Sequence, residues 1–159
     1  MKIINLNLSR EEQVKKLIEA AKAQLGKPYK WGHNINWSEE KEPEAFDCSL
    51  FIQWCFKKIG IWFDEERSTI LQAEASGQEV KRIEDLIPGD LVFFKGTKGY
   101  YDFYDKNKVF GGREIFIGHV GIYCGDGKII HAKGGTGVIE EDLLTSAADK
   151  TITFMKRYF

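Results

Sequence analysis

The sequence of 159 residues contains few of the features that mark specialised classes of protein. Its three cysteines, Cys48, Cys55 and Cys124, are too few, and odd in number, for a secreted domain held together by disulfides. The formal net charge of −1 gives no electrostatic reason to expect binding to nucleic acid or to an anionic membrane. No apolar run has the length of a transmembrane helix. We therefore expect a single globular domain over residues 1–159.

Two stretches in the first half carry the spacing of amphipathic helices. Ser9-Arg10-Glu11-Glu12 is a capping box, and apolar residues then recur at intervals of three and four as far as Leu25. Gly26 and Pro28 oppose continuation, so we expect a helix over about 10–25. A second helix is expected over 48–59, where apolar residues cover most of the circumference, as in a buried helix. A shorter helix is expected over 68–76.

The second half carries strand patterns instead. Ile87-Pro88-Gly89-Asp90 is a turn followed by a short apolar strand, and a D-G pair at Asp126 joins two longer strands as in a β-hairpin. Helices first and antiparallel strands second indicate the α+β class. The expected elements are strands at 91–94, 115–123, 128–132, 138–139 and 151–158, with a short helix at 141–148.

Two segments without periodicity separate these elements. Residues 29–45 are aromatic and polar, and we expect a loop there. Residues 95–114 form a polar insertion rich in glycine and tyrosine. An insertion of this length is either a variable surface loop or a wall or lid beside a functional site, and the sequence leaves both open.

Cys48 stands at the expected start of a helix, where a thiol can become reactive. A thiol with its ordinary pKa is mostly protonated at neutral pH and is a weak nucleophile. The first turn of a helix supplies partial positive charge, which favours the thiolate. A neighbouring imidazole can accept the thiol proton and return it later. Cys48 meets the first condition if its helix begins where the pattern predicts.

His119 and His131 are the candidate partners of Cys48, because they lie in the two strands joined by the D-G turn. If the turn is centred near Asp126, the residue numbers of each cross-strand pair add up to about 252. This register places His119 and His131 nearly opposite each other on one face of the hairpin. One imidazole would accept the Cys48 proton, and the other would fix its tautomer. A register shifted by one residue would move one of them to the other face.

Other uses of these side chains stay open. Cys55 and Cys124 fit small buried hydrophobic residues. A zinc site is a further possibility, because cysteine and histidine are the side chains that bind zinc. The candidate ligands would be Cys48, His119, Cys124 and His131. However, Cys124 and His119 are an odd number of residues apart on one expected strand and would face opposite sides of it. We therefore expect no metal ion.

Four segments, in this order along the chain, resemble the NlpC/p60 family of cell-wall cysteine endopeptidases, whose fold is papain-like. They are G-K-P-Y-K-W-G (26–32), F-D-C-S-L-F-I-Q-W-C-F (46–56), I-P-G-D-L-V-F-F (87–94) and G-H-V-G-I-Y-C-G-D-G-K-I-I-H-A (118–132). The resemblance extends over about residues 11–158. It implies an α+β fold in which N-terminal helices, with the nucleophile at a helix N-terminus, pack on an antiparallel sheet.

The resemblance also implies a reaction. Cys48 would be the nucleophile, His119 the general base and then acid, and His131 the orienting third residue. The reaction would hydrolyse an amide bond in peptidoglycan stem peptides, most often between γ-D-glutamate and a diamino acid in this family, through a thioester. The expected partners are peptidoglycan fragments or muropeptides, and no cofactor is expected.

Residues around the nucleophile would bind the substrate in a relative of this kind. Tyr29 would stabilise the oxyanion together with the backbone N–H of Cys48. Asp47 and Ser49 would line a subsite for a free N-terminal amine, because a carboxylate suits an ammonium group. Trp31 is a further substrate-binding candidate.

Two positions depart from the family pattern. His33 stands where the family has the second glycine of W-G-G, and Leu50 stands where it has the glycine after D-C-S. Both changes fall near the expected cleft and would narrow or redirect it. Two alternatives therefore stay open: a thiol-dependent amidase, thioesterase or acyltransferase of the same superfamily, and a non-catalytic peptide-binding module.

The first residues bear on location. MKIINLNLSREEQ contains neither a long apolar segment nor a small-residue cleavage site, so we expect no secretory signal. Taking Met1 as the initiator, we expect a cytoplasmic protein, or a phage or mobile-element protein that other machinery delivers to the cell wall.

Overall fold

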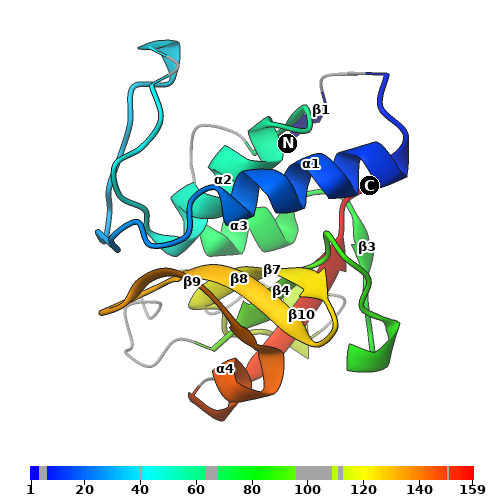
Figure 1. The fold of residues 1–159 in the computed structure, drawn as a ribbon. Helices are drawn as coiled ribbons and strands as arrows, with labels where there is room; N and C mark the ends of the chain where they lie inside the picture. Colours follow the sequence, from blue (N-terminus) through cyan, green and yellow to red (C-terminus); the bar gives the residue numbers. More distant parts are fainter. Residues whose placement is uncertain (4–6, 40, 64–67, 96–108, 111–112, 150) are drawn as a thin grey trace.

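The computed structural model describes residues 1–3, 7–39, 41–63, 68–95, 109–110, 113–149 and 151–159. Helices α1 (Arg10–Lys22), α2 (Cys48–Lys57) and α3 (Thr69–Glu74) lie on one side of an antiparallel sheet, and α4 (Leu143–Asp149) lies on the other side (Figure 1). The strands of this sheet follow the order β3-β10-β4-β7-β8-β9. This arrangement confirms the α+β class that the sequence predicts.

The strands of the main sheet are β3 (Gln78–Glu79), β4 (Leu91–Phe94), β7 (His119–Gly125), β8 (Lys128–Lys133), β9 (Gly137–Asp142) and β10 (Ile152–Arg157). Two small strand pairs stand apart from it, β1 (Lys2–Ile3) with β2 (Ile61–Trp62) and β5 (Val109–Phe110) with β6 (Arg113–Glu114). Short 3-10 turns occur at Trp37–Glu39, inside the expected loop, and at Ile83–Asp85. The greater part of the predicted 95–114 insertion lies outside the described residues.

The two long helices form for the reasons the sequence gives. The Ser9 hydroxyl accepts from the N–H of Glu12 at 3.3 Å, and the Glu12 carboxylate accepts from the N–H of Ser9 at 2.7 Å, which completes the capping box of α1. In α2 every residue from Cys48 to Phe56 is buried, which confirms the prediction of a buried helix.

Both helices end slightly earlier than predicted. Helix α1 stops at Lys22 because the chain must turn toward the sheet: Gly26, with φ of +84°, donates its N–H to the carbonyl of Val138 in β9 at 2.9 Å. Helix α2 stops at Lys57, and residues 58–60 form the closing turn. In α1 a contact with the sheet, and in α2 a closing turn, thus takes the place of the last helical turn that the sequence pattern predicts.

The hairpin forms in the predicted register. Ile122 pairs with Ile130 and Tyr123 with Ile129, so paired residues sum to 252 around the turn at Asp126. The prediction of a strand over 115–123 was wrong at its start, because β7 begins only at His119. Residues 115–118 lie outside any strand, and there the Gly118 N–H donates to the Phe94 carbonyl at 2.7 Å. Strand β9 is longer than predicted and continues to Asp142, so α4 begins two residues later than expected.

Apolar side chains pack on both faces of the sheet. Val120, Ile122 and Ile130 pack with α2 in the larger core, whereas Val92 and Ile129 pack with a second group on the opposite face. The alternation of inward and outward residues along β7 and β8 produces this division. Both faces of the central strands are therefore covered by packed side chains.

The aspartate of the I-P-G-D segment has a structural role. Asp90 is fully buried and accepts two hydrogen bonds from the Arg157 guanidinium, each at 2.8 Å, and one from the Ile87 N–H at 2.9 Å. A bidentate Arg–carboxylate pair is a strong, directional contact. It joins the turn before β4 to the end of β10, two neighbouring strands in the interior of the sheet.

Candidate active site

Cys48 is the first residue of α2, as the sequence predicts. Asp47 is the N-cap of this helix: its carboxylate accepts from the N–H of Leu50 at 2.8 Å and from the Ser49 hydroxyl at 3.0 Å. The same carboxylate accepts from the N–H of Gly32 at 3.1 Å, so it also holds the preceding loop. The Cys48 side chain is 7% exposed and lies in the positive end of the helix dipole.

Tyr29 is held beside the start of α2 by backbone hydrogen bonds. The N–H of Phe46 donates to the carbonyl of Pro28 at 3.0 Å, and the N–H of Lys30 donates to the carbonyl of Phe46 at 2.9 Å. Burial, and then the negative charge of the Cys48 thiolate and of Asp47, raise the pKa of Tyr29 above its ordinary value. The phenol therefore stays protonated and can donate a hydrogen bond.

His119 and His131 form a close polar contact. Nε2 of His119 lies 2.7 Å from Nδ1 of His131, and both side chains are buried. In the observed register Gly121, rather than His119, lies opposite His131, so the two imidazoles are diagonal neighbours on one face. A Cβ atom added at Gly121 would lie 3.2 Å from the Cβ of His131. The missing side chain at Gly121 thus leaves room for the two rings to meet.

The start of α2 and the histidine pair lie at the same end of the sheet. The segment that leads to Tyr29 is hydrogen-bonded to the first residues of β9, because the N–H of Val138 donates to the carbonyl of Lys27 at 2.8 Å. In an antiparallel sheet the start of β9 lies beside the end of β8 and the start of β7, which is His119. The start of α2, with Cys48 and Tyr29 beside it, and the two histidines therefore lie toward the same end of the sheet.

Glu141 belongs to the same cluster, although the sequence analysis did not select it. Its Oε1 lies 3.0 Å from Nε2 of His131, and its two oxygens lie 3.1 and 3.2 Å from Nζ of Lys133. Burial alone would raise the pKa of Glu141, but hydrogen bonds from Lys133 and Ser146, and the positive charges of His131 and Lys133, lower it below the ordinary value. The group is therefore a carboxylate at neutral pH.

The extent of β9, which the sequence pattern does not show, is what turns Glu141 toward His131. Ile139 pairs with His131, and Glu141 follows two residues later on the same face of β9. The sequence pattern predicts only a short strand at 138–139 and a helix from 141, which would have turned Glu141 away from the sheet.

The predicted substrate-binding residues differ in how much surface they offer. Asp47 and Ser49 are mostly buried, and the Asp47 carboxylate accepts the three hydrogen bonds described above. Trp31 is 73% exposed and precedes Gly32, which Asp47 anchors. The exposed indole therefore lies next to a residue that is hydrogen-bonded to the start of α2.

The two departures from the family pattern occupy different environments. The Leu50 side chain is fully buried in the main core, so it does not protrude into an open cleft. His33 is half-buried and lines a hollow of about 240 Å³ together with residues of the 34–44 loop. Only His33 therefore offers a side chain to an open space.

The other two cysteines are in less favourable surroundings for reaction. Cys55 is fully buried on α2, and burial raises the pKa of its thiol. Burial, followed by the charge of Glu140, raises the pKa of Cys124 to about 11. Within the described residues, no three His, Cys, Asp or Glu side chains are arranged to hold a metal ion.

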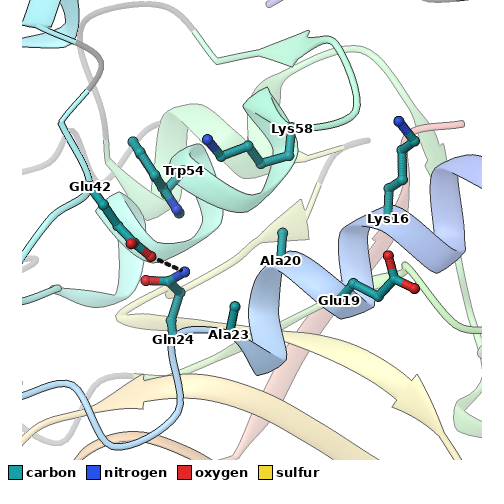
Figure 2. Close-up of a pocket in the computed structure, with 8 residues that line it drawn as sticks. All are labelled: Lys16, Glu19, Ala20, Ala23, Gln24, Glu42, Trp54 and Lys58. Atoms are coloured by element: carbon teal, nitrogen blue, oxygen red, sulfur yellow. Dashed lines mark hydrogen bonds between the residues drawn. The ribbon is translucent and has the colours of Figure 1, made fainter.

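A groove of about 490 Å³ lies between α1 and α2, away from these residues. Figure 2 shows Trp54 of α2 and Lys58, which follows this helix, on one side and Glu19 and Ala20 of α1 on the other. The amide of Gln24 donates to Glu42 at 2.7 Å across one end of the groove. Its lining mixes both signs of charge and contains none of the predicted site residues.

Comparisons with known proteins bear on the family to which the chain belongs. Residues 26–157 match the NlpC/P60 family. The chain is 35% identical over 119 residues to the probable endopeptidase p60 of Listeria innocua. The matching segment covers 74% of this chain and 19% of that protein. It is 31% identical over 129 residues to the probable endopeptidase p60 of Listeria grayi, covering 81% and 20%. The chain thus spans about a fifth of the length of these relatives.

Solved structures share the fold. NlpC1 of Trichomonas vaginalis superposes with a TM-score of 0.69 at 23% identity, over 99% of this chain and 48% of that one. An NlpC/P60 family protein of Bacillus cereus gives a TM-score of 0.66 at 29% identity, over 91% and 40%. No helix within the described residues is long and apolar enough to cross a membrane. On the match over residues 26–157 and the shared fold, this chain belongs to the NlpC/P60 family.

Proposed function

We propose that this chain is a cysteine peptidase that hydrolyses an amide bond in peptidoglycan stem peptides, between γ-D-glutamate and a diamino acid. The relatives named as probable endopeptidases support a peptidase activity. The fold is also that of the NlpC/p60 domain of the peptidoglycan hydrolase SagA, at a TM-score of 0.63 and 24% identity. Peptidoglycan fragments or muropeptides would be the substrates.

The observation that carries the proposal is the 2.7 Å contact between the two imidazoles at the end of the sheet where α2 begins. Because His119 uses Nε2 for this contact, Nδ1 is the nitrogen that would act as the base. The Cys48 S–H proton would move to His119 Nδ1, and the thiolate would attack the carbonyl carbon of the substrate.

Collapse of the tetrahedral intermediate would break the C–N bond. The proton on His119 would pass to the departing amine, leaving a thioester on Cys48. Water would then attack the thioester, give its proton to His119 and release the carboxylic acid with the thiol restored. Each step uses only groups of this chain, the substrate and water.

The negative oxygen of the tetrahedral intermediate would be bound at the start of α2. The Cys48 backbone N–H is one of the first N–H groups of a helix, which have no partner within the helix, and the Tyr29 hydroxyl is a second donor. Two such donors directed at the developing charge stabilise the transition state more than the ground state.

The first test is the pH dependence of alkylation at each cysteine of the folded protein, measured by peptide mass spectrometry. We expect Cys48 to react with iodoacetamide below pH 7. A raised pKa means less thiolate at a given pH, so Cys124 should react slowly until about pH 11 and Cys55 should stay unreacted. His119→Ala should move the Cys48 profile toward that of an ordinary thiol.

A synthetic stem peptide then tests the substrate. Release of a new amine and a new carboxylate that requires Cys48 supports the peptidase. Transfer of an acyl group to an added amine, or thioester cleavage without peptide cleavage, would favour the acyltransferase or thioesterase alternative. A Cys48 that titrates as an ordinary thiol, together with peptide binding but no product, would favour the binding module.

A further inference from the structure

Glu141 lies at the end of a line of polar groups that begins with His119. Nε2 of His119 and Nδ1 of His131 are 2.7 Å apart, and Nε2 of His131 and Oε1 of Glu141 are 3.0 Å apart. The carboxylate oxygen approaches away from the ideal direction of the His131 N–H bond, so this second link is a close charge contact. The line therefore runs from β7 through β8 to β9.

Only one proton can lie between Nε2 of His119 and Nδ1 of His131 at this distance. The proton can be bonded to either nitrogen, which gives two possible arrangements. A neutral imidazole carries one N–H, so one ring nitrogen donates and the other accepts. In the first arrangement His119 donates through Nε2, and its Nδ1 carries the lone pair. In the second, His131 donates through Nδ1, and Nδ1 of His119 carries the proton. Only the first arrangement leaves His119 able to accept a proton from a thiol.

The negative charge of the carboxylate selects between these arrangements, because it attracts a protonated ring nitrogen and repels a nitrogen that carries a lone pair. In the first arrangement Nε2 of His131 carries a proton and faces Glu141 favourably. In the second, the same nitrogen would carry no proton and would lie 3.0 Å from a negative oxygen in a buried site. The same charge also stabilises the positive imidazolium that forms when His119 takes up the thiol proton.

The surroundings of Glu141 keep it in place and ionised. Lys133 of β8 contacts both of its oxygens, and Ser146 of α4 donates a hydrogen bond to it. The Ser146 side chain is 2% exposed, so α4 covers this end of the line. We propose that Glu141 is a positioning residue that sets the tautomer of the histidine pair and so makes Nδ1 of His119 the base. This role rests on the proposed function.

Two substitutions at Glu141 and one matched control test the role. Glu141→Gln keeps the shape and can still turn an oxygen toward His131, so we expect about a 10-fold loss of Cys48 alkylation rate at pH 7. Glu141→Ala removes the acceptor, and we expect about a 100-fold loss, in the range seen when a partner of a functional histidine is removed. Glu140→Gln is the matched control, because it removes the same charge from the preceding residue of β9. There the Glu140 carboxylate lies 3.5 Å from Nζ of Lys22, and its loss should leave the Cys48 alkylation rate unchanged.

The tautomer itself is measured by nitrogen NMR of the histidine rings. We expect a protonated Nε2 on both histidines in the natural protein and in Glu140→Gln, and a mixture of tautomers in the Glu141 variants. With a cleaved substrate, kcat should fall while KM stays within about threefold, because a role in proton transfer affects the transition state.

Wild-type alkylation profiles and tautomers in the Glu141 variants would overturn this inference and leave the proposed function intact. If Glu141→Ala fails to fold, Glu141→Gln decides alone, because its rate and tautomers are measured on a side chain of the same shape. An unreactive Cys48 in the natural protein would instead overturn the proposed function.

Discussion

Cys48 and Cys55 lie seven residues apart on the same helix, and their surroundings are opposites. Cys48 opens α2 beside the Asp47 cap and Tyr29, at the end of the sheet that holds two histidines. Cys55 lies two turns further on, fully buried among aliphatic and aromatic side chains. The comparison indicates that the reactivity of a thiol depends on its place along the helix, since the start of α2 offers polar partners and the position of Cys55 offers apolar packing.

The largest expected effect separates the two thiols directly. Cys48→Ala should lower turnover of a stem peptide by at least about 1000-fold, because it removes the nucleophile, and it should leave the thermal midpoint nearly unchanged. Cys55→Ala should keep kcat within about threefold but reduce the free energy of unfolding by about 1–2 kcal/mol, since it leaves a small cavity in the core. Steady-state kinetics and urea unfolding measure both effects. Equal losses of activity in the two variants would contradict the comparison.

A smaller loss of activity is expected when the histidine pair is displaced and both thiols are kept. Gly121→Ala adds a methyl group 3.2 Å from the Cβ of His131 and should push the two imidazoles apart. We expect kcat to fall by about 10- to 100-fold, because small displacements of catalytic groups have effects of that size. The Cys48 alkylation profile should shift upward in pH, while Cys55 stays unreacted.

Gly134→Ala is the control for this variant. The nearest atom to a methyl group added there, on the Tyr29 ring, is 3.8 Å away, an ordinary contact, so activity should be retained. A Gly121→Ala protein with the activity and alkylation profile of the natural protein would show that the close approach of the rings is not required.

The smallest of these effects concerns the polar start of α2. Asp47→Ala removes the acceptor for the Leu50, Ser49 and Gly32 donors, and should reduce the free energy of unfolding by about 1–2 kcal/mol. Urea unfolding measures it. Ser9→Ala removes the exposed cap of α1 and should have a smaller effect. If Asp47→Ala is no more destabilising than Ser9→Ala, the loop anchored through Gly32 contributes nothing to stability.

Much of the fold follows from local patterns that the sequence displays. The capping box at Ser9 starts α1 where predicted, and the D-G turn at Asp126 gives the predicted register of β7 and β8. Both signals act within a few residues, so no distant contact is needed to produce them. The ends of elements were less predictable, as at Gly26, because a hydrogen bond to Val138, distant in sequence, decides where the chain leaves the helix.

The candidate site was predictable in its main members and incomplete in its supporting ones. Cys48, His119 and His131 could be selected because a helix start and a hairpin register are both visible in the sequence. The cap role of Asp47 had a signal in its place before the helix, but the sequence analysis assigned its carboxylate to a substrate amine. Glu141 had no clear signal, because the strand that turns it toward His131 is stabilised by pairing with β8 along its whole length.

The sequence by itself determined the fold class, the buried character of α2 and the hairpin that carries both histidines, because periodicity, caps and turns act over short distances along the chain. Only the tertiary structure decided that Glu141 faces His131, that Asp47 holds the loop at Gly32, and that Asp90 pairs with Arg157 across 67 residues of chain. These contacts join segments whose approach depends on the packing of the whole sheet and its helices, and no local pattern specifies that packing.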